Sequence, residues 1–155
     1  MPDRRATAIT LWPCDAQARP LAAAPPTPWT RYLAWADGQV VGGGGFTGPP
    51  RHGRVEIGYF TLPCQQRQGH GRRTANALLA LAWAADASLT VIAHTRHAPR
   101  QGRRNTDAAA SARILQSLGF GPPRPARNPR VGPVWRWTLP PDRPDRQPQA
   151  PTINP

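Results

Sequence analysis

The sequence predicts a single α/β domain in which helices flank a mixed central sheet, with an antiparallel meander beside a parallel pair of strands. Three observations support this prediction. The 155 residues suffice for one hydrophobic core but not for two. Short strand patterns joined by a tight turn come first, which indicates antiparallel pairing. Strand patterns then alternate with two helical patterns, and strands joined by a helical crossover pair in parallel.

The front of the chain reads as a proline-rich segment followed by a hairpin. Residues 13–29 hold five prolines, so we expect no long uninterrupted helix there. Residues 31–36 and 39–43 form strand patterns, and the Asp37-Gly38 pair between them is typical of a two-residue hairpin turn. Residues 44–53 are rich in Gly and Pro and are predicted to form a loop.

The most regular strand pattern covers residues 54–62, which are apolar on both faces and are therefore predicted to form a central strand. Pro63 ends it. Residues 74–85 then form a helical pattern with an apolar stripe at i, i+3 and i+4 steps. The stripe consists of Ala75, Leu78, Leu81, Ala82 and Ala85.

The second half of the chain adds a strand, a helix and a closing strand. Residues 89–95 are rich in β-branched side chains, and a basic loop follows them. Asp107 is a candidate N-cap for a helix over 108–118, which Gly119 can close in the left-handed conformation. Residues 134–139 are predicted to form the last strand.

These boundaries place one domain at residues 1–139, with a short, Pro-rich and atypical N-terminal part at 1–30. The polar, Pro-rich residues 140–155 are expected to be disordered. No apolar run approaches the ~20 residues of a membrane-spanning helix, and the first residues lack the apolar stretch of a secretion signal. We therefore expect a soluble cytoplasmic protein without a membrane partner, either a monomer or a homodimer.

The net charge of +12 comes from arginine alone, since the chain has no lysine. The arginines are scattered, apart from one cluster between Arg96 and Arg104. This charge favours an anionic ligand without identifying it. Nucleic acid is not the expected partner, because the tryptophans fall within strand and helix patterns and do not interleave with basic residues. Cys14 and Cys64 are too few for a structural zinc site, so they read as reduced thiols and no metal is predicted.

Two Gly-rich stretches are candidates for binding an anion. Gly43 to Gly48 match the dinucleotide pattern G-x-G-x-x-G, but Pro49-Pro50 follows and no helix begins there, so we interpret this match as fortuitous. The second stretch, Gln66 to Thr74, joins the central strand directly to a helix. Glycines there let the backbone turn its N–H groups toward one point, and the first helical turn adds free donors.

Arg72 and Arg73 stand at the same helix end, where cations are disfavoured by roughly 0.3–1 kcal/mol each unless an anion is present. The alternative to an anion site is a solvated turn with two exposed arginines and no ligand. A Lys-Ser/Thr pair is missing from the stretch, which argues against a nucleoside-triphosphatase loop.

The stretch Gln66-x-x-Gly69-x-Gly71 resembles the Q/R-x-x-G-x-G/A motif of the GNAT acetyltransferases, whose backbone amides bind the pyrophosphate of coenzyme A. An overlapping register that starts at Gln68 better fits the distance to Trp83 but ends in Arg73 where Gly or Ala is expected. Both registers define the same pocket.

Three further stretches resemble the branch that includes the ribosomal-protein alanine acetyltransferases. They are Glu56-Ile-Gly-Tyr59, Ala110 to Phe120, and Val134-Trp-Arg-Trp137. The chain departs from the family in two places: Ala108 and Ala109 stand where an Asn usually helps to hold coenzyme A, and the usual N-terminal helical pair is replaced by a short, Pro-rich region.

The resemblance implies an N-acetyltransferase that moves the acetyl group of acetyl-CoA to a primary amine, on a peptide N-terminus or on a small molecule. It implies that a strand N–H near Phe60 to Leu62 stabilises the oxyanion and that Glu56, the only Glu in the chain, is the base. The residues assigned to the cofactor are Phe60, Thr61, Leu62, Gln66, Arg67, Gln68, Gly69, His70, Gly71, Arg72, Arg73 and Thr74.

Other readings of these residues stay open. Glu56 is about as well explained as a partner for one of the many arginines. Tyr59 is a candidate proton donor to the leaving thiolate, but it is more easily explained as a core residue. His70 and His94 receive no catalytic role. The alternative function is a non-catalytic one: a basic binding protein, or a degenerate fold that retains only coenzyme A binding.

Overall fold

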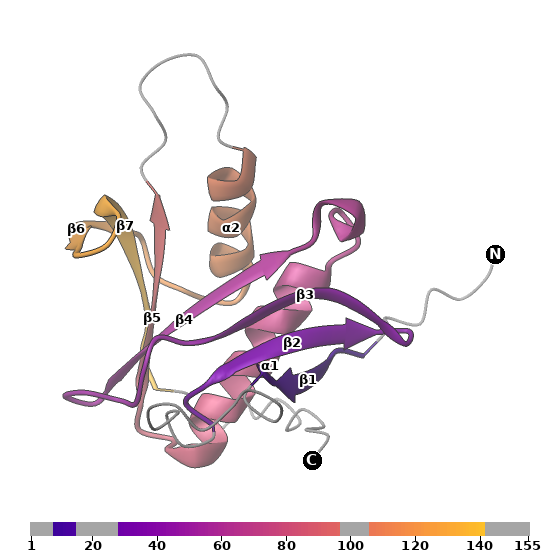
Figure 1. Ribbon diagram of the computed structural model, residues 1–155. Helices are drawn as coiled ribbons and strands as arrows, with labels where there is room; N and C mark the ends of the chain where they lie inside the picture. Colours follow the sequence, from indigo (N-terminus) through magenta and orange to yellow (C-terminus); the bar gives the residue numbers. More distant parts are fainter. Residues whose placement is uncertain (1–7, 15–27, 97–105, 142–155) are drawn as a thin grey trace.

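The protein forms a seven-stranded sheet with helices on one face (Figure 1). The computed structural model describes residues 8–14, 28–96 and 106–141. The strand order is β1-β2-β3-β4-β5-β7-β6, in which only β4 and β5 pair in parallel. The predicted mixed sheet is therefore confirmed. The strands are β1 (Thr10–Pro13), β2 (Arg31–Ala36), β3 (Gln39–Phe46), β4 (Arg54–Thr61), β5 (Thr90–Arg96), β6 (Arg124–Asn128) and β7 (Gly132–Leu139).

The hairpin between β2 and β3 confirms the predicted turn, because Asp37 and Gly38 both have positive φ, 49° and 75°, as a two-residue hairpin of this kind requires. The predicted loop at residue 44 was wrong, since β3 continues through Phe46. Its four consecutive glycines lie very close to the neighbouring strands. A Cβ added at Gly45 would stand 2.5 Å from the carbonyl oxygen of Thr30. Most of the stretch that matches the dinucleotide pattern therefore belongs to strand β3 and not to a loop before a helix, as expected if the match is fortuitous.

Helix α1 (His70–Ala85) crosses one face of the sheet and buries an apolar stripe against it (Figure 1). Its Ala- and Leu-rich sequence favours helix, and its apolar stripe packs on β3 and β4. Leu78, fully buried, belongs to the same core cluster as Val55 and Ile57 of β4. Burying one such leucine stabilises the fold by about 1.5–3 kcal/mol. The helix begins four residues before the predicted start, so Gly71, Arg72 and Arg73 belong to its first turn.

Helix α2 (Thr106–Ser117) lies beside the end of β5 (Figure 1). It starts one residue before the predicted N-cap, Asp107. Its end confirms the prediction: Gly119 has φ 93°, and the amide of Phe120 donates to the carbonyl of Leu115. The arginine cluster predicted after β5 lies, apart from Arg96, outside the described residues, as does the predicted disordered tail from residue 142.

Strands β1 and β6 were missed by the sequence analysis. Both are edge strands that contain proline, Pro13 and Pro125, and proline is tolerated at an edge because one side of the strand has no ladder to complete. Pattern rules that treat proline as a strand breaker therefore overlook them.

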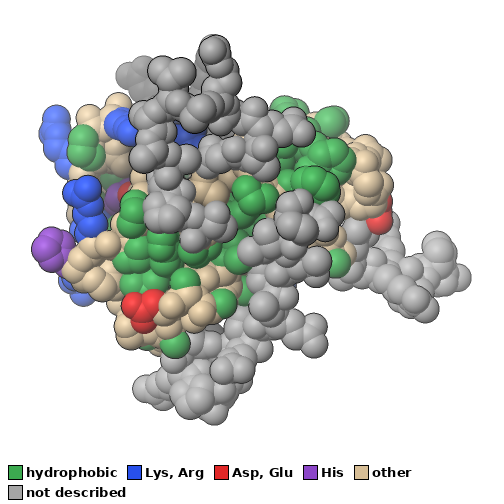
Figure 2. Space-filling model, turned by 60° about the horizontal axis from the view of Figure 1, so that its bottom comes forward, with side chains coloured by type: hydrophobic (Ala, Val, Ile, Leu, Met, Phe, Trp, Pro, Cys, Tyr) green, Lys and Arg blue, Asp and Glu red, His purple; other side chains and the backbone are tan. Residues whose placement is uncertain are grey.

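Strand β4 is central, but the prediction that it is apolar on both faces was wrong. Val55 and Ile57 are buried under α1, whereas Glu56, Gly58 and Phe60 point to the opposite face. Phe60 is 55% exposed. No helix covers that face within the described ranges. A space-filling view, with the bottom of Figure 1 turned forward, shows hydrophobic side chains exposed beside an edge where arginines gather (Figure 2).

Strands β4 and β5 pair only over their first halves. The parallel register joins Arg54–Ile57 to Thr90–Ala93, although β4 continues to Thr61 and β5 to Arg96. Beyond these pairs the two strands diverge toward α2 (Figure 1). The pairing of the two strands therefore ends in the middle of the sheet, next to the N-terminus of α1, and we call this gap in the pairing the β4–β5 opening. No helix among the described residues is both long and apolar enough to span a membrane.

Candidate functional site

A cavity of about 590 Å³ lies where β4, the start of α1 and α2 meet. Strand β4 supplies one wall and α2 the opposite wall, and the turn between β4 and α1 forms the end. The lining residues are Tyr59, Phe60, Thr61, Gln66, Arg67, Gly69, His70, Gly71, Arg72, Ala110, Ser111, Arg113 and Ile114.

The turn before α1 is shaped to point main-chain N–H groups into this cavity. Arg67 and Gly69 both have positive φ, 64° and 76°, with a residue of ordinary φ between them. Successive residues of alternating hand turn their N–H groups to one side, which makes an anion-binding concavity. Gly69 is also the N-cap of α1, and it provides no side chain to cap the helix.

The first amides of α1 have no partner in the described part of the protein. The earliest main-chain bond at this end runs from the amide of Arg73 to the carbonyl of Gly69, at 3.2 Å. The N–H groups of His70, Gly71 and Arg72 precede it and donate to no acceptor among the described residues. A helix end of this kind, with its positive dipole, attracts phosphate.

Glycine at position 71 keeps this end of the cavity open. A Cβ built there would lie 3.1 Å from Cδ1 of Ile114 and 3.1 Å from Oγ1 of Thr61, one on each side of the cavity. Any side chain at Gly71 would therefore fill the space in front of the free amides.

The two arginines of the first turn bind the protein itself. The Nε of Arg72 donates to Oγ of Ser117 at 3.1 Å, which ties α1 to α2. One terminal nitrogen of Arg73 donates to the carbonyl of Gln68 at 2.7 Å and lies 3.2 Å from Nδ1 of His70. Both cations therefore have acceptors within the protein, and their position at the helix N-terminus does not by itself indicate an anion. The free amides carry the case for an anion site.

His70 is buried at the same helix end. Burial and then the charge of Arg73 lower its pKa below the ordinary value, so the ring is neutral near pH 7. Because Arg73 donates toward Nδ1, the neutral ring carries its proton on Nε2.

The opening between β4 and β5 exposes unpaired main-chain groups of β4. The carbonyl of Glu56 and the amide of Leu62 both bond toward β3. Main-chain groups alternate sides along a strand, so those of Tyr59 and Thr61 face the opening instead. Of the three residues predicted to supply an oxyanion donor, only Thr61 directs its N–H there.

Tyr59 lies on the wall of the cavity, on the same side of β4 as α1. Its hydroxyl lies 3.5 Å from the main-chain oxygen of Ser111 in α2. Burial raises the pKa of this phenol well above its ordinary value, which keeps it protonated. From the sequence, Tyr59 was interpreted as a core residue and was not assigned to the site.

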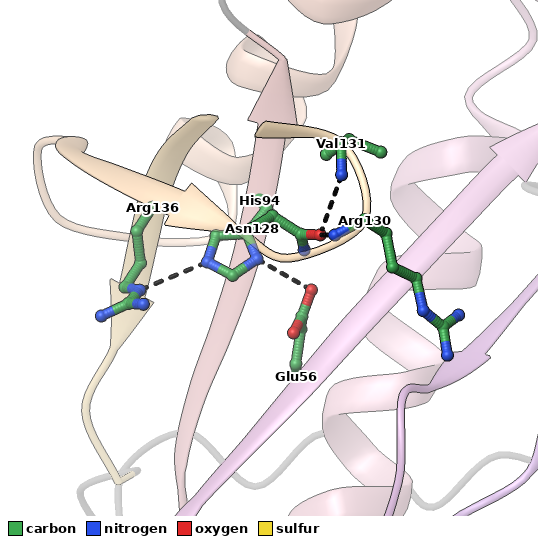
Figure 3. A network of polar contacts seen from close by, with 6 residues as sticks. All are labelled: Glu56, His94, Asn128, Arg130, Val131 and Arg136. Carbon is green, nitrogen blue, oxygen red and sulfur yellow. Dashed lines mark hydrogen bonds and ion pairs between the residues drawn. The ribbon is translucent and has the colours of Figure 1, made fainter. Parts of the chain in front are cut away.

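Glu56 lies on the opposite face of the sheet and does not line the cavity (Figure 3). Its Oε1 accepts from Nδ1 of His94 at 2.9 Å, and Nε of Arg136 donates to Nε2 of His94 at 3.2 Å. Since Arg136 can only donate, Nε2 of His94 accepts, and Nδ1 carries the proton that is donated to Glu56. Three strands, β4, β5 and β7, thus hold the carboxylate in one orientation.

The family can be assigned at this point. The family model described as the acetyltransferase (GNAT) family matches residues 4–105. This chain belongs to the GNAT family. Comparison with curated protein sequences gives no match.

Solved structures share the fold. One is yncA from Salmonella typhimurium, determined with acetyl-CoA, with a TM-score of 0.55 and 22% identity over 75% of this chain and 66% of that one. A ribosomal-protein-S5-alanine acetyltransferase from Vibrio fischeri gives 0.56 and 17% over 73% and 62%. A spermidine N-acetyltransferase from Vibrio cholerae gives 0.56 and 14% over 71% and 63%. This chain spans 62–66% of the length of these three proteins.

The structure brings most residues of the predicted cofactor site together around the cavity. Four of the predicted residues do not line it: Leu62 bonds β3 through its amide, Thr74 is buried in α1, and Gln68 and Arg73 bond to each other. The lining residues of α2 were missed, although the Ala-Ser pair at positions 110 and 111 marked that helix. No group of three or more His, Cys, Asp or Glu gathers in the described ranges, and Cys14 and Cys64 are both exposed.

Proposed function

We propose that this protein is an N-acetyltransferase that moves the acetyl group of acetyl-CoA to a primary amine. The observation that carries the proposal is the set of free amides at His70, Gly71 and Arg72, which face a cavity of about 590 Å³ at a helix N-terminus. Pyrophosphate is the part of acetyl-CoA that such amides recognise. The thioester supplies an activated acetyl group. The protein has to orient this group, accept a proton from the amine and donate one to the leaving thiolate.

The opening between β4 and β5 is where the thioester would lie. Thr61 directs its N–H into that opening and would donate a hydrogen bond to the thioester oxygen. Main-chain donors fixed in this way stabilise the negative charge that develops on the oxygen during acyl transfer, and one such donor typically contributes ~2.7–4 kcal/mol. The rigid pairing of β4 with β3 holds the donor in place.

Tyr59 and Glu56 lie on opposite sides of β4, which suits two separate proton transfers. Tyr59, on the cavity side and protonated, would give a proton to the leaving thiolate. Glu56, on the other side, would receive the proton that the attacking amine loses. Five residues of strand, about 16 Å, separate Glu56 from Thr61, so that proton would travel through water.

Calorimetry with acetyl-CoA tests the proposal. We expect micromolar affinity, about −8 kcal/mol, for the natural sequence. Gly71→Glu should abolish binding, because the side chain fills the cavity and sets a carboxylate against the pyrophosphate. Gly48→Glu is the matched control: it adds the same charge at a glycine with no atom within 4 Å, and its affinity should be unchanged. Equal affinities in the two variants would remove the site.

Amine turnover separates the enzyme from a fold that only binds the cofactor. With acetyl-CoA bound, a panel of peptide N-termini and small amines should release free thiol. Binding without thiol release from any amine would favour a degenerate fold. Failure to bind acetyl-CoA, together with salt-dependent binding of nucleic acid, would favour a basic binding protein.

A further inference from the structure

Arginine side chains lie side by side on the face of the sheet that carries Glu56. Arg136 of β7 pairs directly with His94 of β5 on one side and with Arg124 of β6 on the other. Residues directly opposite one another share a face, so His94, Arg136 and Arg124 form a row across three strands. Glu56 of β4, whose register partner is Ile92, joins this row diagonally through its hydrogen bond to His94. Arg96, two residues after His94 in β5, points to the same face.

Among the residues that the structure describes, this row has more positive charge than nearby carboxylates neutralise. Like charges directly opposite one another in a sheet are destabilising, yet Arg124 and Arg136 occupy such a pair. Glu56 is the one carboxylate of the row, and it is already bonded to His94. Of the other carboxylates whose side chains are described, Asp37 lies in the β2–β3 turn and Asp86 bonds Ser88 at the end of α1.

Arg136 is held in an orientation that leaves its binding end open. Its Nε is used by His94, and within the described residues its two terminal nitrogens have no acceptor (Figure 3). These two nitrogens form the planar fork that binds a carboxylate or phosphate through two parallel hydrogen bonds. Arg124 is exposed, and it forms no hydrogen bond or ion pair with any residue that the structure describes.

We propose that Arg136 and Arg124 form an anion subsite for the acceptor, and that the acceptor is a small amine bearing a carboxylate or phosphate group. This inference rests on the proposed function. Neighbouring strands lie about 4.8 Å apart, so the main chain at Arg136 lies about 10 Å across the sheet from that at Glu56, and the side chains close much of this distance. A single imidazole, that of His94, bridges the carboxylate of Glu56 and Nε of Arg136, so a short acceptor can reach both ends of the row. Polyamines, which are cationic throughout, are poor acceptors for this surface.

Binding of simple anions tests the subsite without any turnover. Acetate and inorganic phosphate are titrated separately into labelled protein, and the Nε–Hε signal of Arg136 is followed by NMR. A saturable shift is expected, with Arg124→Gln weakening the apparent affinity about tenfold. Tighter binding of acetate indicates a carboxylate acceptor, and tighter binding of phosphate a phosphorylated one.

Arg127→Gln is the matched control, because Arg127 is an exposed arginine of the same strand whose side chain points to the other face. Its affinity for both anions should equal that of the natural sequence. An unsaturable shift at Arg136, or equal weakening in the two variants, would overturn the subsite. Calorimetry with acetyl-CoA reads the cofactor site separately, so failure of the proposed function can be told apart from failure of the subsite.

Turnover then measures selectivity and span together. Amino acids with one to five carbons between amine and carboxylate are compared with their amides by thiol release. The acid should exceed its amide in kcat/KM by about tenfold at the best length, and Arg124→Gln should remove that preference while Arg127→Gln keeps it. Equal kcat/KM within every pair, or turnover of no member of any pair, contradicts the proposal.

Discussion

The two sides of the β4–β5 opening are built from different parts of the chain. On the side of α1, the candidate cofactor site is made of main-chain amides from one continuous stretch, and glycine keeps it open. On the other side, the row from Glu56 to Arg124 is made of side chains from four strands. A main-chain site is therefore damaged by adding atoms, whereas a side-chain site is damaged by removing them.

The comparison also separates binding from turnover. Substitutions on the side of Glu56 should leave the affinity for acetyl-CoA unchanged while they alter the rate or the choice of acceptor. Substitutions at the start of α1 should alter that affinity first. Of the four predictions that follow, in order of decreasing effect, the first two test this division and the last two test how the start of α1 is held in the folded protein.

Glu56→Gln should lower kcat/KM about 100-fold, since general bases typically contribute 10²–10⁴-fold. The affinity for acetyl-CoA should stay the same, because Glu56 lies outside the cavity. The measurement is thiol release across pH 6–9 with calorimetry in parallel. Asp86→Asn removes the same charge at the far end of α1 and should leave the rate unaltered. An unchanged rate in Glu56→Gln across this range would remove Glu56 as the base.

Tyr59→Phe should lower kcat about tenfold by removing the proton donor to the leaving thiolate, with the cofactor affinity retained. Because burial raises its pKa, Tyr59 stays protonated from pH 6 to 9, and the natural sequence should show no loss of rate there from ionisation of this phenol. If Tyr59→Phe turned over at the natural rate, the residue would be a wall of the cavity and nothing more.

Gly69→Ala should destabilise the fold by about 1–2 kcal/mol, because Gly69 holds a left-handed conformation, φ 76°, that an L side chain disfavours. Urea unfolding measures the change. Gly48→Ala is the control, since a side chain there meets no atom within 4 Å and φ is not in the left-handed region. Equal stability in the two variants would show that the turn before α1 is not constrained.

His70 should give the smallest effect, a pH dependence of stability. Its pKa is lowered in the folded protein, so the unfolded chain binds the proton more readily. The contribution of the neutral ring is present above the unfolded pKa of about 6.5 and is lost as the pH falls through the folded value. Urea unfolding at several pH values should show His70→Gln with a shallower decline than the natural sequence, whereas His52→Gln should follow the natural sequence.

The sequence predicted the turn between β4 and α1 well because its signals are local. A strand, a stretch with Gly69 and Gly71, and a helix occur in one continuous segment, and their chemistry depends on backbone conformation that glycine permits. The exact helix start was not predictable, since His70 to Arg73 carry no capping side chain and no apolar stripe. The β4–β5 pair was predicted for a similar reason, from the crossover through α1.

The other side depended on register, which a single sequence does not provide. Glu56 bonds His94 only because β4 and β5 pair as they do, and Arg136 reaches His94 through a specific alignment of β7. Sequence analysis named Glu56 but assigned His94 no role, and it could not place Arg124, whose strand is interrupted by proline. Tyr59 was not assigned to the site, because a side chain that lines an inner cavity shows the same alternation along a strand as one in the core.

NMR of the main-chain amides tests the central claim most directly. Labelled protein is titrated with acetyl-CoA and, separately, with acetyl-pantetheine, which lacks the pyrophosphate. The account predicts saturable downfield shifts of the amides of His70, Gly71 and Arg72 with acetyl-CoA and none with acetyl-pantetheine. Acetyl-CoA that binds while these three amides keep their free positions, or that shifts them no more than acetyl-pantetheine does, would contradict it.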